Sequence, residues 1–136
     1  MNLMEKFPIL YTTRAINEDG LQGRAYVPDG LAVPVASPLK DVPGTNPEQL
    51  LGLALSTCLN ATLAAIEGEH NQPHQSRVVT TVSMSRDRFG YQFFVDAQVT
   101  IPEVDPATAS HWLALAEQRC PVAKLLGGST SVKIHL

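Results

Sequence analysis

The first third of the chain contains short stretches in which apolar and polar residues alternate. This alternation covers residues 9–15, 23–27 and 31–36, and turn-forming stretches at residues 17–20 and 28–30 separate them. A period of two sends successive side chains to opposite faces of a β-strand. We therefore predict three short strands in this part of the chain.

Apolar positions then continue without alternation through a long uncharged stretch, residues 49–66. The residues before it suit the start of a helix, with Asn46 as the capping residue, Pro47 at the first position and Glu48 in the first turn. The stretch contains no proline and one glycine, Gly52. We therefore predict a helix from about residue 47 to about residue 68.

This uncharged segment has the minimum length for a membrane span. Polar residues interrupt it, and a helix that is apolar on nearly all sides is explained more simply as a core helix of a globular protein. The chain starts with the sequence MNLMEKFPIL, in which Glu5 and Pro8 stand where the apolar part of an export signal would lie. We therefore expect no membrane insertion and a cytoplasmic location. The polar positions are Gln49, Ser56, Thr57, Asn60 and Thr62.

Two longer alternating stretches follow, over residues 77–86 and 90–101, with a turn at residues 87–90. They predict a β-hairpin in which every second residue from Val78 to Met84 lies on one face. The alternation differs from the preceding helical segment, so the chain changes from helix to sheet at this point.

The end of the chain returns to helical spacing. Asp105 and Pro106 suit the start of a helix that we predict to end near Arg119. A proline then starts a short helix over residues 121–126, and residues 131–136 form a final strand. The predicted order is strand, strand, strand, helix, strand, strand, helix, helix, strand. This is an α+β pattern with antiparallel hairpins in a single domain of 136 residues.

Composition and charge narrow the choice of partners. Charged residues make up 17% of the chain, which is slightly low and suggests that an oligomer covers part of the surface. The net charge is −3, and no run of basic residues is longer than two. Because phosphate binding needs clustered Lys and Arg, we do not expect nucleic acid as a partner.

The two cysteines, Cys58 and Cys120, are the candidate reactive groups. Each one alone has an ordinary interpretation as a small buried apolar residue. A permanent disulfide is rare in the cytoplasm, so a redox-active pair is the main alternative. Cys120 precedes a proline, and the N–H groups of the following short helix would lower the pKa of its thiol. We predict no metal site, because Pro73 separates His70 from His74 and no cysteine has a further ligand at metal-binding spacing.

Two segments carry a more specific signal. Residues 44–50 read GTNPEQL, with Cys58 ten residues after Glu48, and residues 120–124 read CPVAK. These segments resemble the two motifs of the OsmC/Ohr family of organic hydroperoxide reductases. The opening strands and turn at residues 23–30 and the final strand also resemble that family, so the similarity extends over nearly the whole chain.

This resemblance implies a fold, an assembly and a chemistry. The fold is the OsmC-like α+β fold, with antiparallel sheets packed on two long central helices of a tightly intertwined homodimer. Cys58 is implied to be the peroxidatic cysteine, Cys120 the resolving cysteine and Glu48 a carboxylate partner. The implied substrates are organic, lipid-like hydroperoxides, and the implied reductant is an external dithiol of the lipoyl type. The family uses no metal and no flavin cofactor.

One departure from the family pattern matters for the cation. Leu21 stands where the Ohr branch has the arginine that activates the thiolate. We therefore expect Arg24, or Arg14 as the alternative, to serve as the cation, with Glu48 orienting it through paired hydrogen bonds. On a straight helix Glu48 lies about 15 Å from Cys58 along the axis. The helix must therefore bend, or these groups must meet across a dimer interface.

The predicted function is a thiol-dependent peroxidase, and the chain is expected to be a divergent member of its family. The uncharged helix would also supply an apolar pocket for alkyl hydroperoxides. A thiol redox sensor, or a small-ligand-binding dimer with little turnover, is the alternative that the displaced arginine favours. A structural domain with two inert core cysteines is a third interpretation.

Overall fold

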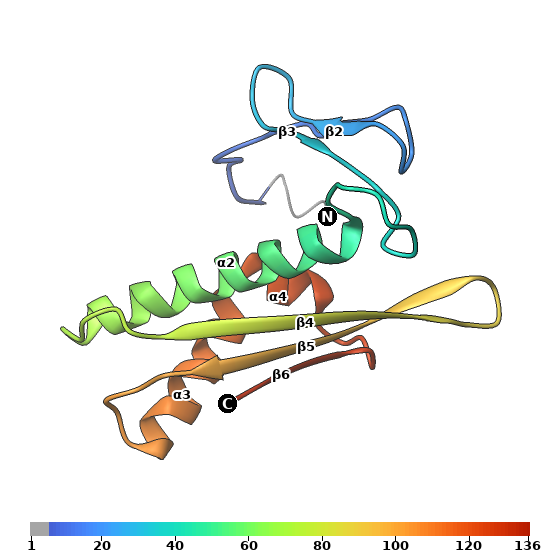
Figure 1. The fold of residues 1–136 in the computed structure, drawn as a ribbon. Coiled ribbons are helices and arrows are strands. Elements are labelled where there is room, and N and C mark those ends of the chain that lie inside the picture. Colours follow the sequence, from blue (N-terminus) through green and yellow to red (C-terminus); the bar gives the residue numbers. More distant parts are fainter. Residues whose placement is uncertain (1–5) are drawn as a thin grey trace. The chain divides into compact units, whose positions relative to one another are not determined.

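The computed structural model describes residues 6–136. The expectation that the chain starts without an export signal falls partly on residues 1–5, which lie outside the described residues. The chain divides into two compact units between Asn46 and Pro47, and each unit is described by itself. The described strands and helices follow the predicted order of elements (Figure 1). The assignment of the whole chain to one domain stays a prediction.

The first unit contains a three-stranded antiparallel sheet. Its strands are β1 (Ile16–Asn17), β2 (Arg24–Tyr26) and β3 (Ala32–Pro34), in the order β1-β2-β3. The second and third predicted strands are confirmed as β2 and β3, although both are shorter than expected.

The predicted first strand, residues 9–15, is wrong, because pairing begins only at Ile16. Ile16 lies opposite Tyr26, so any earlier residue would lie opposite the chain beyond Tyr26. There Pro28 has no N–H to donate and the backbone turns, with a positive φ of 58° at Asp29. An alternating stretch such as residues 9–15 therefore forms a strand only where a neighbouring strand is available to pair with it.

Helix α2 (Pro47–Glu69) begins and ends close to the predicted residues. Its fully buried residues recur at intervals of three and four, as expected for one face of a helix. Leu53 is 64% exposed, so the helix is buried on one face only, and the expectation of a helix buried nearly all round is corrected. By length and composition alone, α2 is long and apolar enough to cross a membrane. The fully buried apolar residues are Leu55, Leu59, Leu63 and Ile66.

The second unit contains a three-stranded sheet in the order β4-β5-β6. The predicted hairpin is confirmed as β4 (Arg77–Arg86) and β5 (Tyr91–Thr100), which pair antiparallel over their whole length. Every second residue from Val78 to Met84 is half-buried, as the alternation predicts.

The last strand, β6 (Val132–His135), pairs with β5 in parallel, with Val132 opposite Val95. The expectation of purely antiparallel sheets is therefore wrong at this edge. The physical reason is the connection: two helices lie between β5 and β6 and return the chain to the end of the sheet where β5 begins.

Two further helices complete the unit. Helix α3 (Pro106–Arg119) is capped by Asp105, whose Oδ1 accepts a hydrogen bond of 2.7 Å from the N–H of Thr108. Helix α4 (Pro121–Leu126) follows after one residue, Cys120. Both predicted helices are confirmed.

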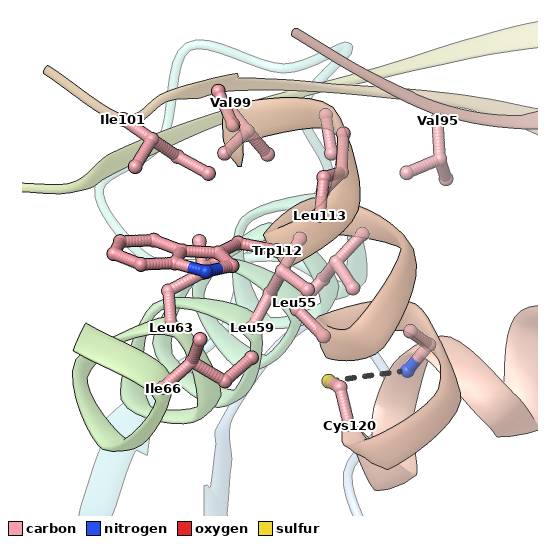
Figure 2. Close-up of a cluster of buried hydrophobic side chains, with 14 residues drawn as sticks. Leu55, Leu59, Leu63, Ile66, Val95, Val99, Ile101, Trp112, Leu113 and Cys120 are labelled. Carbon is pink, nitrogen blue, oxygen red and sulfur yellow. Dashed lines mark hydrogen bonds between the residues drawn. The ribbon is translucent and has the colours of Figure 1, made fainter. Parts of the chain in front are cut away.

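A continuous core lies between the helices and the second sheet. Helix α2 runs along β4 and packs on that sheet, and α3 and α4 pack against α2 (Figure 1). Trp112 and Leu113 of α3 meet the buried leucines of α2, and Val95, Val99 and Ile101 face them from the sheet (Figure 2). Cys120 belongs to this core, which fixes its position between the helices.

Candidate thiol site

Cys58 lies in the middle of α2, beside the fully buried stripe of the helix. Its side chain is half-buried and packs against the hydrophobic core from one side. Its carbonyl oxygen accepts a hydrogen bond of 2.9 Å from Oγ1 of Thr62, in addition to its place in the helix. The residue is therefore held within the helix and remains partly exposed.

Cys120 occupies the junction between α3 and α4. Its N–H donates to the carbonyl oxygen of Ala116 in α3, and its carbonyl oxygen accepts from the N–H of Lys124 in α4. Its sulfur accepts a hydrogen bond of 3.4 Å from the N–H of Ala123, shown as the dashed line in Figure 2. Pro121 starts α4 without needing a donor partner for its own nitrogen. The residue is fully buried, with 0% exposure.

The structure brings the two thiols together. Both are free thiols, and Cys58 lies near enough to Cys120 to affect the pKa of the Cys120 thiol. Burial raises the pKa of the Cys120 thiol, and the neighbouring Cys58 raises it further, whereas the N–H of Ala123 acts in the opposite direction. The predicted N–H contact is therefore present and acts to lower the pKa of Cys120, as expected, but the pKa is raised overall because desolvation of the thiolate outweighs this contact.

Glu48 lies in the first turn of α2 and is half-buried. It lines a cleft of about 530 Å³ between α2 and β4. Residues of the uncharged helix line this cleft, as predicted for an apolar pocket, but Cys58 is not among the lining residues. Ser56 and Thr80, on opposite walls, share a hydrogen bond of 2.7 Å. The complete lining is Glu48, Gln49, Gly52, Leu53, Ser56, Thr80 and Val82.

The candidate cations belong to the first unit. The guanidinium of Arg24 stacks on the ring of Tyr26 at 4.1 Å from its centre, and the hydroxyl of Tyr26 donates a bond of 3.1 Å to Glu18. That hydrogen bond raises the pKa of Tyr26, with burial as the next cause. Arg14 is exposed and precedes β1. The activating role of either arginine stays a prediction, and so does the orienting role of Glu48.

A buried polar cluster at the end of α2 was not predicted from the sequence. Glu67 is 2% exposed, and its Oε1 lies 2.7 Å from Oγ of Ser76 and 2.9 Å from Nδ1 of His74. The N–H of Gln75 donates to its other oxygen at 3.1 Å, and Ser76 also contacts Asn60 at 2.8 Å. Burial opposes ionisation of Glu67, but these hydrogen bonds outweigh it, and the pKa of Glu67 lies below its usual value.

A sequence signal for this cluster exists. Glu67 continues the four-residue spacing of Leu55, Leu59 and Leu63, so the helical pattern already assigns it to the buried face. Polar residues that can pair with it follow within ten positions. Among residues 6–136, no group of three His, Cys, Asp or Glu side chains is arranged to hold a metal ion.

Comparison with known proteins supports the resemblance. Residues 39–135 match the family model of OsmC-like proteins. The organic hydroperoxide resistance protein-like 2 of Staphylococcus epidermidis (strain RP62A) is 28% identical over 135 residues, covering 93% of this chain and 95% of that protein. The organic hydroperoxide resistance protein OhrB of Bacillus subtilis (strain 168) is 30% identical over 95 residues, covering 68% of this chain and 70% of that protein.

Solved structures agree with this assignment. A protein from Lactobacillus casei ATCC 334, provisionally described as a redox protein, is 49% identical and superposes with a TM-score of 0.91, covering 99% of this chain and 96% of that one. The crystal structure of OhrB from Bacillus subtilis superposes with a TM-score of 0.83 at 27% identity, covering 94% of this chain and 99% of that one. The α+β fold of this chain is thus the OsmC-like fold, and the chain belongs to the OsmC/Ohr family.

Proposed function

We propose that this chain is a thiol-dependent peroxidase that reduces organic, lipid-like hydroperoxides and contributes to resistance against them under oxidative stress. The observation that carries the proposal is that the half-buried Cys58 packs against the core that contains the fully buried Cys120, near enough to affect the pKa of its thiol. One sulfur is accessible to a substrate, and the other lies beside it in the core. Inert core cysteines would need neither this proximity nor the difference in exposure.

The reaction uses the two thiols in sequence. The Cys58 thiolate attacks one oxygen of the hydroperoxide, the O–O bond breaks, and the alkoxide takes up a proton and leaves as an alcohol. Cys58 is then a sulfenic acid. Attack by Cys120 on that sulfur forms the Cys58–Cys120 disulfide and releases water. An external dithiol, of the lipoyl type in our proposal, returns both cysteines to thiols by exchange.

The assembly and the cation belong to the same proposal. We propose a homodimer in the cytoplasm with Arg24, or else Arg14, as the cation that stabilises the Cys58 thiolate, and with Glu48 orienting that arginine. Exposed apolar side chains support an interface with a second copy, since a small soluble protein rarely leaves many of them in water. They include Leu10 and Tyr11 in the first unit and Leu53 on α2.

A turnover assay tests the function. Purified protein with a dithiol should consume cumene hydroperoxide faster than hydrogen peroxide, which serves as the matched polar substrate. Cys58→Ser should abolish turnover because no nucleophile remains. In the absence of dithiol, Cys120→Ser should perform one attack and stop at a sulfenic acid that dimedone labels. Full activity in both variants would eliminate the peroxidase proposal. Slow turnover with a reversible disulfide would indicate the thiol sensor instead.

A further inference from the structure

The two sulfurs of the pair differ in how they can be approached. Cys58 is half-buried, whereas Cys120 has no exposed surface. The core around Cys120 contains Leu55, Leu59 and Leu113 (Figure 2). An external thiol that must reach the sulfur of Cys120 would have to pass through this packed core.

We propose that the reductant attacks the sulfur of Cys58 in the disulfide and that the sulfur of Cys120 is always the leaving group, so the mixed disulfide with the reductant forms on Cys58 alone. This inference rests on the proposed disulfide cycle and adds its direction. It names Cys58 as the residue that meets both the hydroperoxide and the reducing thiol.

The first argument for this direction is access. Thiol–disulfide exchange depends on which sulfur a thiolate can reach, and the attacking, central and leaving sulfurs lie roughly in a line. A thiolate that attacks Cys58 approaches from the exposed side of that residue, and the electron pair of the broken S–S bond passes to Cys120 in the core. Attack on Cys120 would require the thiolate to approach along the opposite line, from within the core cluster that holds Cys120.

The second argument is the stabilisation of the leaving sulfur. The N–H of Ala123 donates to the sulfur of Cys120, and the backbone of Val122 adds a further favourable contact for the thiolate. These donors offset part of the desolvation that raises the pKa of Cys120, so they reduce the cost of releasing its thiolate into the core, and access decides the direction. The backbone groups around Cys58 lie in the middle of α2, where the helix's own hydrogen bonds use them.

The exchange balances as two steps. A thiolate of the dithiol forms a bond to the sulfur of Cys58, the Cys58–Cys120 bond breaks, and Cys120 leaves as a thiolate that takes up a proton. The second thiol of the reductant, once deprotonated, attacks the reductant's own sulfur in the mixed disulfide. Cys58 is released as a thiolate, and the reductant departs as a cyclic disulfide after losing two electrons.

Peptide mapping after reduction by a monothiol tests the direction, because a monothiol cannot complete the second step. The disulfide is formed with cumene hydroperoxide in one sample and with diamide in another. Each sample is treated briefly with glutathione, quenched with acid, and labelled with N-ethylmaleimide at mildly acidic pH. The sequence contains two cysteines, so mass spectrometry assigns each adduct without ambiguity.

The expected product carries glutathione on Cys58 and maleimide on Cys120, in excess over the reverse product by about tenfold or more. The same disulfide treated in guanidinium chloride is the control, and there both sulfurs should react. Glutathione mainly on Cys120, or an equal mixture in the folded protein, would overturn the inference. So would the failure of both oxidants to form the disulfide. A disulfide that diamide forms but cumene hydroperoxide does not would contradict the proposed function and leave the direction measurable.

Discussion

At the scale of single residues, Glu67 differs from every other charged side chain described in the structure, since it is ionisable and almost completely buried. Its hydrogen bonds to Ser76, His74 and Gln75 connect the last turns of α2 to the segment that leads into β4. Because a buried carboxylate is costly without such partners, the cluster fixes where the helix ends relative to the sheet.

We expect Glu67→Gln to lower the free energy of unfolding by about 2 kcal/mol, because hydrogen bonds to a charged group contribute about 1.5–3 kcal/mol. The matched control is Glu69→Gln, which breaks the exposed ion pair with Arg119 and should cost under about 1 kcal/mol. Urea unfolding at neutral pH measures both. Equal losses would show that the buried cluster contributes nothing specific.

The acid side of the pH profile follows from the same residue. The pKa of folded Glu67 is lowered, so its contribution is complete above the unfolded value of about 4.3 and disappears as the pH falls through the folded pKa. The difference between the wild type and Glu67→Gln should therefore shrink in acid.

At the scale of elements, α2 combines a buried face, an exposed face and a cleft. Gly52 lines that cleft and lies in the interior of the helix. A Cβ atom at this position would lie 3.5 Å from Cγ2 of Val82 and 3.7 Å from the carbonyl oxygen of Thr80, which are ordinary contacts. Nothing in the described residues therefore requires glycine here for reasons of space.

We expect Gly52→Ala to raise the free energy of unfolding by about 1 kcal/mol, because alanine loses less backbone entropy in a helix. Ala54→Gly is the matched control at an exposed position of the same helix, where the opposite change should cost about 1 kcal/mol. Chemical denaturation of both variants checks the prediction. A destabilised Gly52→Ala protein would mean that something outside the described contacts needs the open cleft.

Several elements were predictable from the sequence because their signals are local. The ends of α2 and α3 follow from Asn46, Pro47, Asp105 and Pro106, and the hairpin follows from its alternation. The missing strand at residues 9–15 and the parallel pairing of β6 were not predictable in this way. Pairing partner and direction are set by distant parts of the chain, which a local pattern does not contain.

The candidate site also combines features that local sequence signals predict with features that distant parts of the chain determine. Motif spacing identified both cysteines, and the structure brings their thiols close together. The N–H contact at Cys120 was predicted, but the overall rise in its pKa was not, because the local N–H donor is visible in sequence and the surrounding core is not. Glu67 was missed because its partners come from the segment after α2, although its helical spacing already places it on the buried face.

At the scale of the whole molecule, the pair of His135 and Asp96 makes the stability of the protein depend on pH on the alkaline side of the profile. Nε2 of His135 in β6 lies 3.0 Å and 3.1 Å from the two carboxylate oxygens of Asp96 in β5. The hydrogen bond to Asp96 is the main cause that raises the pKa of His135, and the carbonyl oxygen of Leu136 adds to it, whereas burial and Lys133 oppose it. The pair joins the two parallel strands of the second unit.

We expect the His135–Asp96 pair to stabilise the protein fully below the unfolded histidine pKa of about 6.5 and to weaken as the pH rises through the raised folded value. His135→Gln should flatten this loss, whereas exposed His111→Gln, on α3, should not. Melting temperatures recorded from mildly acidic to mildly alkaline pH test the sign. A wild-type profile unchanged by His135→Gln would contradict the pairing.

The proposed disulfide also joins distant parts of the chain. It would link the middle of α2 to the α3–α4 junction and enclose β4, β5 and α3. Closing a loop of about 60 residues restricts the unfolded chain by about 4 kcal/mol in the chain-entropy model. The protein oxidised with diamide should therefore melt at a higher temperature than the reduced protein, and Cys120→Ser should show no such difference.

This link between oxidation and unfolding bears on how long the protein persists in a cell. Degradation acts mainly on chains that have opened, so a form that opens less often survives longer. In the proposed cycle, oxidised molecules would accumulate when hydroperoxide outpaces the supply of reducing thiols, and these molecules would resist proteases best. The stock of protein would then last through the period in which replacement by new synthesis is slowest.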